Sequence, residues 1–328
     1  MARAAVLGAT GHIGAHITRA LLAGGHAVRA VYRRDRYLHV LDQLSVDRVQ
    51  ADVDDAAALR RAIGGCDWVF HAAGYYPPPG TRRATALDVA IRSTRRIADT
   101  LHAARIGRVV FTSSASTTAC VHGRLATDAD PEPWPADRRK SLYGTVKTAM
   151  EHEMRRAAAE GLPVVIVNPS ICLGEYDAHA FSGRAVLAFA RGRLPFYVPA
   201  MMSFIYTGDV GVGHVRAAER GRIGERYLFS SRNMPVRDFA GLVARTAGVR
   251  PPRIRVPHAA AYLAALASEA VARLQGREPL LARDELASAR RRQGLDAGRA
   301  VRELGLPQTP IEEAVARALD WFKRNRYI

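Results

Sequence analysis

Two residues whose types and spacing could carry proton-transfer chemistry lie in the segment SLYGTVKTAME, residues 141–151. Tyr143 and Lys147 are four positions apart, so a helix over this segment would place both side chains on one face. A free tyrosine has a pKa near ~10 and is a poor base at neutral pH, but a nearby ammonium group stabilises the phenolate and lowers that pKa. The pair therefore predicts a general acid and base, although the same spacing also occurs in ordinary helices.

Two serines of the segment FTSSAS, residues 111–116, could act on the same substrate. The apolar run over 108–114 predicts a strand, and Ser114 stands at its carboxyl end. In a parallel sheet flanked by helices, ligands bind at the carboxyl ends of the strands. We therefore expect the hydroxyl groups of Ser114 and Ser116 to reach the carbonyl oxygen of a substrate.

Three glycines in the segment GATGHIG lie between a short apolar run and a helical pattern. At such a turn Gly8 permits the tight bend, Gly11 lets the backbone approach a pyrophosphate, and Gly14 lets the helix pack closely on the strand. The amides at the start of the helix would face the phosphates, where the helix dipole favours negative charge. We interpret the segment as a dinucleotide-binding turn, although glycine-rich turns also serve packing alone. The other residues of this turn that we expect at the cofactor are Thr10, His12 and Ile13.

The end of the second predicted strand, in VYRRDR, should decide which nicotinamide cofactor binds. An acidic residue at this position would suit NAD by accepting hydrogen bonds from the ribose hydroxyls, but the chain has Arg33 and Arg34 here. A guanidinium group favours the 2′-phosphate of NADP through charge-assisted, bidentate hydrogen bonds. We therefore expect NADP rather than NAD. The alternative is that both residues reflect a general arginine bias.

The segment ADVDD, residues 51–55, follows the third predicted strand. Asp52 could accept a hydrogen bond from the adenine amino group, with Val53 beside it at the cofactor. Asp54 or Asp55 would instead cap the helix that follows.

Strand and helix patterns alternate along the first half of the chain, which predicts an α/β protein with a doubly wound parallel sheet, the Rossmann fold. The expected strands cover 4–7, 27–32, 46–52, 67–73, 108–114 and 163–168, and the expected helices follow residue 11 and cover 54–63, about 87–101 and about 138–160. We assign residues 1–170 to this NAD(P)-binding domain. Residues 171–328 predict mainly a smaller C-terminal substrate-binding lobe, with some segments returning to the Rossmann core. In this lobe we expect isolated strands over 226–230 and 253–256 and a terminal amphipathic helix around 310–325.

The composition is that of a folded soluble protein, with 48% hydrophobic and 24% charged residues among 328. The net charge of +17 comes almost entirely from arginine, because only Lys140, Lys147 and Lys323 are lysines. The arginines are scattered and belong to no recognised nucleic-acid module. The arginine and alanine bias is better explained by GC-rich coding than by selection for a phosphate-binding face, so we expect no nucleic-acid partner. Attraction to anionic substrates or membrane surfaces fits the charge better than nucleic-acid binding does.

The remaining bulk features indicate a cytoplasmic enzyme without a metal. Cys66, Cys120 and Cys172 are odd in number and widely spaced, which predicts neither a disulfide framework nor a metal site. The chain runs from Met1 directly into the first strand, so we expect no signal peptide. The apolar stretch over 259–272 is shorter than the ~20 residues of a membrane span. We expect a buried helix there rather than an anchor.

A first-strand glycine turn, a serine at the fifth strand's end and the Tyr-Lys pair on the next helix occur together here. With the segments GATGHIG, ADVDD, HAAG, RVVFTSSAS, YGTVK and VIVNPSICLG in this order, nearly the whole chain resembles the extended short-chain dehydrogenase/reductase superfamily. Within it, the chain is similar to the dihydroflavonol reductase and 3β-hydroxysteroid dehydrogenase branch, and to bacterial proteins labelled hopanoid-associated sugar epimerases.

The resemblance implies a role for each matching residue. Ser114 would orient the substrate, Tyr143 would donate or accept the proton, and Lys147 would lower the pKa of Tyr143 and hold the nicotinamide ribose. Further cofactor contacts would come from Ala72, Ala73, Pro169 and Ile171. The resemblance also implies a homodimer. One departure is Ala90, where family members often have an asparagine that supports a proton relay.

These observations predict an NADPH-dependent carbonyl reductase, or its reverse, an alcohol dehydrogenase. The expected substrate is a bulky, largely apolar or cyclic ketone or secondary alcohol. The residues expected around it are Tyr75, Tyr76, Pro77 to Pro79, Ser116, Phe181, Phe196, Tyr197, Met201, Met202 and Phe204. The alternatives are a sugar epimerase that retains its cofactor through the reaction and, in another class, a non-catalytic cofactor-binding regulator.

Overall fold

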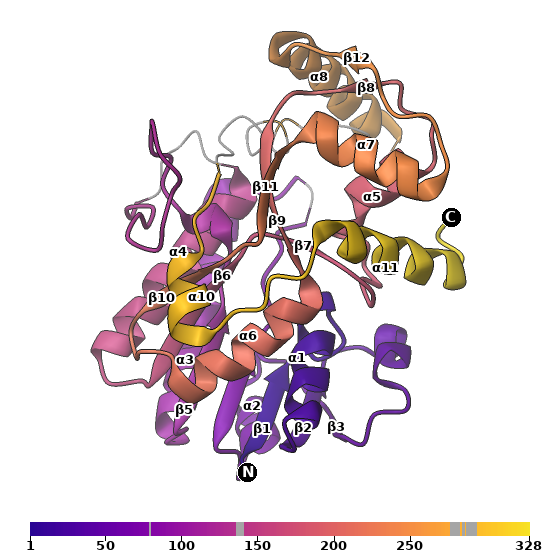
Figure 1. The fold of residues 1–328 in the computed structure, drawn as a ribbon. Helices are drawn as coiled ribbons and strands as arrows, with labels where there is room; N and C mark the ends of the chain where they lie inside the picture. The colour runs from indigo at the N-terminus through magenta and orange to yellow at the C-terminus, as the bar shows by residue number, and fades with distance from the viewer. Residues whose placement is uncertain (79, 136–140, 276–282, 284–285, 287–293) are drawn as a thin grey trace.

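A seven-stranded sheet forms the base of the molecule in the computed structural model (Figure 1). The structure describes the chain except residues 79, 136–140, 276–282, 284–285 and 287–293, and it describes only the backbone at 273 and 274. The strands pair in parallel in the order β10-β6-β5-β4-β1-β2-β3, which confirms the predicted Rossmann-like α/β fold. They are β1 (Arg3–Leu7), β2 (Ala27–Tyr32), β3 (Asp47–Gln50), β4 (Trp68–His71), β5 (Arg108–Thr112), β6 (Val164–Pro169) and β10 (Arg226–Phe229).

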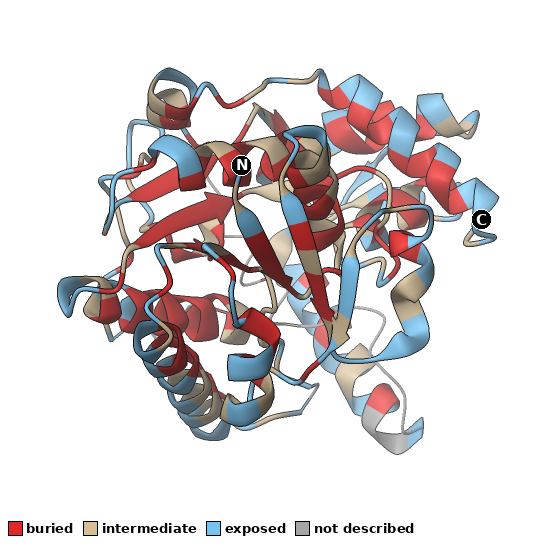
Figure 2. Ribbon diagram, turned by 90° about the horizontal axis from the view of Figure 1, so that it is seen from below, coloured by how far each residue is buried: buried red, intermediate tan, exposed pale blue. Residues whose placement is uncertain are grey.

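Successive strand residues enter two different apolar cores, because strand side chains point alternately to opposite faces of a sheet. Ala4 and Val6 of β1 pack in one core, whereas Ala5 and Leu7 pack in the other. Figure 2 shows the result, with buried strands between helices that are buried on their inner sides and exposed on their outer sides. The first core is closed by α1 (His12–Ala23) and α6 (Thr207–Arg220), and the second by α2 (Ala56–Ile63), α3 (Arg83–Ala103) and α4 (Leu142–Ala159).

Shorter elements from the second half of the chain stand above the carboxyl edge of the sheet in Figure 1. They include a three-stranded sheet in the order β11-β9-β7 and the strand pair β12-β8. Their bounds are β7 (Ile171–Leu173), α5 (Gly183–Ala190), β8 (Phe196–Tyr197), β9 (Met201–Tyr206), β11 (Arg232–Pro235), α7 (Val236–Ala247), β12 (Ile254–Arg255), α8 (His258–Gln275) and α11 (Ile311–Arg324). The helix α10 (Gly298–Leu304) lies lower, against α6 and β10 of the main sheet. Two short 3-10 helices, η1 (Asp35–Leu41) and η2 (Ala115–Thr117), follow β2 and β5.

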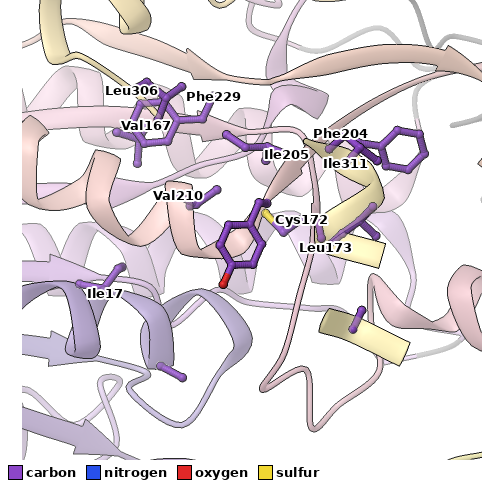
Figure 3. Packing of buried hydrophobic residues seen from close by; sticks show 14 of the residues in the cluster. Ile17, Val167, Cys172, Leu173, Phe204, Ile205, Val210, Phe229, Leu306 and Ile311 are labelled. Carbon is purple, nitrogen blue, oxygen red and sulfur yellow. The ribbon is translucent and has the colours of Figure 1, made fainter. Parts of the chain in front are cut away.

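One apolar cluster joins the main sheet to these C-terminal elements. Figure 3 shows its members around Val210 of α6, with Ile17 from α1, Phe204 from β9 and Ile311 from α11. Phe204 and Val210 are fully buried. Since burial of apolar surface is the main favourable contribution to folding, this continuous cluster fixes the C-terminal elements on the sheet.

Three segments refine the expectations for the start of α4 and for the C-terminal lobe. The strand expected by itself over 226–230 is β10, which pairs with β6 as the seventh strand of the main sheet. The expected terminal helix is α11, with Val315, Leu319 and Phe322 buried. The helix expected over about 138–160 is α4, which begins at Leu142, and residues 136–140 lie outside the described residues.

The apolar segment over 259–272 forms α8, but the expected burial of this helix was wrong. The side chains that pack inward are small ones such as Ala261 and Ala265, whereas Leu263 is 66% exposed. The sequence pattern could not reveal this orientation, because apolar residues occupy every side of the helix. Among the described helices, none combines the length and the apolar character needed to cross a bilayer.

Candidate active site

A cavity of about 1040 Å³ opens at the carboxyl ends of β1, β2, β4, β5 and β6. This is the edge where a doubly wound sheet binds its ligands, because the strand order reverses here between β1 and β4. Most residues that the sequence singled out line this one cavity: Gly8, Thr10, Gly11, His12, Ile13, Gly14, Arg33, Arg34, Val53, Ala72, Ala73, Tyr75, Tyr76, Ser114, Ser116, Tyr143, Lys147, Pro169, Ile171 and Phe181.

The glycine turn between β1 and α1 has the close approaches that require glycine. Gly8 has a φ of 82°, in the left-handed region that side chains rarely adopt. A Cβ atom on Gly14 would lie 2.1 Å from the carbonyl oxygen of Gly8, which leaves no room for any side chain. The turn is closed by a hydrogen bond that the Gly11 N–H donates to the same oxygen at 2.9 Å. The backbone thus forms an open cradle at the start of α1.

Buried polar atoms around this cradle fit a dinucleotide. No side chain caps the N-terminus of α1, so its first amides face the cavity without a protein acceptor. Within the described part of the chain, the His12 Nε2, Ser116 Oγ and Ser170 Oγ atoms are buried without a hydrogen-bond partner. Burial lowers the pKa of His12, so its ring is neutral at pH 7 and can donate one hydrogen bond. A bound phosphate and nicotinamide amide would supply these missing partners.

The adenosine end of the cavity carries two exposed arginines at the end of β2. Arg33 and Arg34 line the cavity, and in the described residues neither guanidinium group has an ion-pair partner. Asp52 differs from the sequence expectation because it lies outside the cavity lining and its carboxylate accepts the N–H of Asp54 at 3.0 Å. The tight turn after β3 directs Val53 and Asp54 into the cavity instead.

The hydroxyl groups expected to act on a substrate converge on Tyr143. Ser141 caps α4 by accepting the Gly144 N–H at 3.0 Å, and Tyr143 therefore lies in the first turn of this helix. Ser114 and Tyr76 both hydrogen-bond to Tyr143 through their hydroxyl groups. Ser114 Oγ also accepts the Ser116 N–H at 3.1 Å, which leaves the Ser114 hydroxyl proton for the Tyr143 oxygen. One phenol oxygen thus receives two donors at the cavity wall.

The pKa of Tyr143 differs from the expected direction. Burial raises this pKa above its ordinary value, and the hydrogen bonds from Ser114 and Tyr76 oppose the rise only in part. Lys147 itself is buried, and the loss of water lowers the pKa of its ammonium group to about 8. Tyr143 is therefore held as a neutral phenol, which is the form that can donate a proton to a carbonyl oxygen.

Two neighbours position the Lys147 ammonium group within the cavity. A Cβ atom on Gly74 would lie 2.9 Å from Lys147 Nζ, so glycine at this position leaves the space that the ammonium occupies. The Tyr76 ring has its centre 5.6 Å from the same Nζ atom. The ammonium is thereby within range of a weak attraction to the ring face.

A buried carboxylate that the sequence analysis missed anchors this part of α4. Glu151, one turn beyond Lys147, accepts hydrogen bonds from Ser113 Oγ at 2.5 Å, from Thr117 Oγ1 at 2.7 Å and from Asn168 Nδ2 at 2.6 Å. It also pairs with the buried Arg226 at 3.0 Å. These partners come from the residue that follows β5 and from η2, β6 and β10, so one side chain ties α4 to the strand ends that carry the site. The only sequence signal was a second i, i+4 spacing from Lys147.

Aromatic rings form the opposite, substrate end of the cavity. The Tyr76 ring stacks on Tyr143 at a centroid distance of 5.5 Å and packs edge-on against Phe181 at 4.7 Å. Phe181 is 57% exposed and faces open cavity space. The buried Asp177 holds its loop by accepting the N–H groups of Phe181 at 3.1 Å and Gly183 at 2.7 Å. Asp177 also lines the cavity, and no sequence pattern had identified it.

Several residues expected at the substrate lie elsewhere. Met202 and Phe204 of β9 point into the apolar core and are 8% and 0% exposed, whereas Ser203 between them lines the cavity. Strand alternation explains the difference, because neighbouring side chains face opposite sides. Among the described lining residues, Met201, Phe196 and Tyr197 do not occur, and Pro79 lies outside the described residues. The described residues hold no cluster of metal-ligand side chains, and the three cysteines are free thiols.

Comparisons with known proteins agree with this geometry. The model of the NAD dependent epimerase/dehydratase family matches residues 4–228. A Synechocystis protein named as a dihydroflavonol 4-reductase is 31% identical over 98% of this chain and 95% of its own length. The sterol demethylase protein B of Methylococcus capsulatus is also 31% identical, over 98% of this chain and 99% of its own.

A solved structure extends the comparison to three dimensions. The crystal structure of a nucleoside-diphosphate-sugar epimerase from Pseudomonas aeruginosa superposes with a TM-score of 0.83 at 30% identity, over 100% of this chain and 99% of the other. The family model matches residues 4–228, which run from β1 through β9, and the two relatives match nearly the full length of the chain. The chain therefore belongs to the NAD dependent epimerase/dehydratase family, within the extended short-chain dehydrogenases/reductases, and is an NAD(P)-dependent oxidoreductase.

Proposed function

We propose that this enzyme is an NADPH-dependent carbonyl reductase, or in reverse an alcohol dehydrogenase, that uses Ser114, Tyr143 and Lys147. The observation that carries the proposal is the convergence of donors on one oxygen, since the Ser114 hydroxyl bonds to Tyr143 beside the buried Lys147. A nicotinamide bound along the cavity would supply or accept a hydride. Residues 1–170 would mainly bind this cofactor, and residues 171–328 would mainly bind the substrate.

The roles of the three residues follow from their protonation. In carbonyl reduction the neutral Tyr143 phenol donates its proton to the substrate oxygen, while Ser114 donates a hydrogen bond that holds this oxygen. Lys147, with its pKa lowered to about 8, is mostly protonated at pH 7 and stabilises the phenolate that the transfer leaves. Positioned acid catalysis of this kind contributes roughly 10²–10⁴ in rate.

The preference for NADPH over NADH rests on the adenosine end of the cavity. Arg33 and Arg34 line the end of the cavity where we expect the 2′-phosphate to bind, and Arg36 also lines this end. The described lining contains Asp54 there, but its carboxylate accepts the Ser93 hydroxyl. A guanidinium pair with no carboxylate partner attracts a dianionic phosphate more strongly than a neutral hydroxyl.

The substrate class follows from the aromatic end. The rings of Tyr76, Phe181 and Tyr143 offer flat apolar faces, which favour a bulky, largely apolar or cyclic compound. The names of two relatives, which refer to a dihydroflavonol and to a sterol, agree with such a class. A small hydrophilic carbonyl compound would leave these rings in contact with water.

A screen of carbonyl compounds tests this function. Cyclic and aromatic ketones, sterol ketones, short aliphatic aldehydes and nucleotide sugars would each be incubated with NADPH or NADH, with cofactor oxidation followed by absorbance and the product identified by mass spectrometry. We expect alcohol formation in equal amount to NADPH oxidised, with the apolar cyclic ketones turned over best. Turnover of nucleotide sugars alone would contradict the proposal.

A second candidate function is epimerisation of a sugar with the cofactor retained. The 30% identity to a nucleoside-diphosphate-sugar epimerase favours it. Such an enzyme would carry tightly bound NAD through purification and would convert the sugar without added cofactor. Release of the cofactor by mild denaturation, followed by its identification, separates this candidate from the reductase.

A further inference from the structure

The helix α8 turns its large apolar side chains toward solvent. The outward residues Tyr262, Leu263, Leu266 and Val271 are 46%, 66%, 38% and 49% exposed. Alanines fill the other outward positions: Ala259, Ala260, Ala264, Ala267 and Ala270. At 100° per residue these nine positions span roughly half of the helix circumference, and none of them is charged.

The inward side of α8 is the reverse of an ordinary surface helix. Ala261 and Ala265 pack against Val198 and Val256, and Ala272 is buried as well. A surface helix normally buries its large apolar residues and exposes its polar ones. Here the small residues are buried and the large ones are exposed, so the large apolar side chains add little to the stability of the chain itself. Contact with an apolar partner would bury these exposed side chains.

The apolar surface continues from α8 onto the strand pair β12-β8. Ile254 and Phe196 are cross-strand neighbours, and they are 58% and 46% exposed. Val256 and Val198 follow directly after these two strands and contact the inner side of α8. In Figure 1 this end of the molecule stands farthest from the N-terminal strands, free of the main sheet. The exposed residues thus lie together at one end of the protein. We term this region the α8 surface, and it comprises residues 259–271 with Phe196 and Ile254.

The charged residues around the α8 surface are almost all positive. Residues 191–200 and 249–272 contain five arginines and one carboxylate, Glu269. Arg283 already pairs with Glu269 at 2.8 Å. The arginines are Arg191, Arg193, Arg250, Arg253 and Arg255, all exposed. In the described residues none of these five forms an ion pair, so their charge is available to an anionic partner.

We propose that the α8 surface docks the protein on a bilayer of anionic phospholipid. The apolar side chains would enter the boundary between headgroups and acyl chains, and the arginines would contact the phosphates. Tyr262 has the apolar ring and polar tip that suit this boundary. Because no described helix is long and apolar enough to cross a membrane, α8 lies on the surface rather than spanning it.

Charge complementarity decides between a bilayer and a second copy of this chain. A two-fold dimer through the α8 surface would bring the same arginines of two copies together, and like charges at short range repel. An anionic membrane offers the opposite charge over the whole end of the molecule. The docked state would bring an enzyme that we propose to act on apolar compounds to the phase where such compounds collect, and only this last step rests on the proposed function.

Vesicle flotation of the full-length protein tests the docking. The protein would be mixed with vesicles of phosphatidylcholine alone, or of phosphatidylcholine and phosphatidylglycerol in equal parts, and the bound fraction measured against lipid concentration. Leu263→Glu is the main variant, since the exposed position should tolerate glutamate without loss of fold. The matched control is Val301→Glu, because Val301 is a 38% exposed apolar residue of α10, away from the α8 surface.

We expect the wild type and Val301→Glu to bind the mixed vesicles equally. Leu263→Glu should bind at least about tenfold more weakly, because a leucine loses its burial and a negative charge faces the lipid. Replacing Arg253 and Arg255 with glutamine should weaken binding to the mixed vesicles about fivefold per arginine and leave the weak binding to phosphatidylcholine unchanged. Circular dichroism would show that the variants stay folded.

Three results would overturn the proposal. The first is a wild type that stays with neither kind of vesicle. The second is equal binding by Leu263→Glu and Val301→Glu, which would reduce the interaction to net charge alone. The third is a wild-type dimer in solution that Leu263→Glu converts to a monomer without any vesicle binding, which would assign the α8 surface to a second copy. Since none of these measurements uses turnover, they stand apart from the test of the proposed function.

Discussion

The cofactor end and the substrate end of the cavity are built in different ways. At the cofactor end, backbone atoms of the turn from Gly8 to Gly14 form the cavity wall. A Cβ at Gly14 would come within 2.1 Å of the Gly8 carbonyl oxygen. At the substrate end, the ring centroids of Tyr76 and Phe181 are 4.7 Å apart, although more than a hundred residues separate the two in the chain. One end is set by local backbone geometry and the other by side chains that tertiary folding brings together.

This difference bears on which substitutions each end tolerates. A turn defined by backbone contacts fails when a single methyl group is added, because the atoms around it belong to the main chain. A wall of side chains from separate loops can change shape residue by residue and still close the cavity. We therefore expect changes at the catalytic and cofactor residues to abolish or redirect function, and changes at the aromatic wall to adjust substrate affinity.

Tyr143→Phe should have the largest effect on turnover. Without the phenol proton, the rate of carbonyl reduction should fall by about 10²–10⁴, while the dissociation constant for NADPH stays within about twofold. Steady-state kinetics and fluorescence titration measure the two quantities. Tyr197→Phe serves as the control, since Tyr197 lies outside the cavity lining and its loss of a hydroxyl should leave the rate unchanged. Equal rates for Tyr143→Phe and wild type would refute the acid-base role.

Arg33→Ala should have the next largest effect, confined to the cofactor. Loss of a charge-assisted hydrogen bond to the 2′-phosphate should weaken NADPH binding by about 10-fold to 100-fold and leave NADH binding nearly unchanged. Isothermal titration with both cofactors measures the change in preference. Arg61→Ala, an exposed arginine at the end of α2, is the matched control for lost net charge. An unaltered preference in Arg33→Ala would remove the basis for assigning NADP.

Phe181→Ala and Met202→Ala separate the aromatic wall from the core. Phe181 is exposed in the cavity, so its truncation should raise KM about tenfold for an apolar ketone and change the free energy of unfolding little. Met202 is in the core, so Met202→Ala should lower the free energy of unfolding by about 2–5 kcal/mol and leave KM unchanged. Kinetics and chemical denaturation of both variants provide the test. A raised KM with an unchanged free energy of unfolding in Met202→Ala would instead place Met202 at the substrate.

Tyr76→Phe should have the smallest effect, seen in the pH dependence. The Tyr76 hydroxyl donates to the Tyr143 oxygen and so lowers the pKa of Tyr143. Its removal should raise this pKa by less than about one unit. Alcohol oxidation needs the Tyr143 phenolate as base, so the pH of half-maximal oxidation should move upward, while reduction at pH 7 changes little. A downward or absent shift in the oxidation profile would show that Tyr76 does not donate to Tyr143 during the reaction.

Much of the fold and the cofactor end could be predicted from short segments. Strand and helix patterns are local, and parallel strands joined by helices can close in few ways, so the doubly wound parallel sheet followed from the alternation. The place of β10 as its seventh strand did not. The glycines at 8, 11 and 14, the serine at 114 and the pair at 143 and 147 stand at fixed distances from strand ends, and all of them line one cavity.

The remaining features depend on contacts that no local pattern encodes. Met202 and Ser203 are neighbours on β9 that face opposite sides of the strand, and the neighbouring elements decide which side faces the cavity. Asp52 could not be distinguished from Asp54 without the turn that follows β3. The apolar composition of α8 gave no sign of its outward side, because a helix that is apolar all round has no pattern to read. Glu151 was missed since its four partners come from segments far apart in the chain.

Transfer of deuterium from labelled NADPH tests the central claim most directly. NADPH carrying deuterium at the transferred C4 position would be incubated with an apolar cyclic ketone that supports its oxidation, and the product would be analysed by mass spectrometry and NMR. A reductase places one deuterium on the carbinol carbon for each NADPH oxidised, and Tyr143→Phe should form almost none of this product. Conversion of a nucleotide sugar without added cofactor, together with no deuterium in any alcohol, would contradict the account.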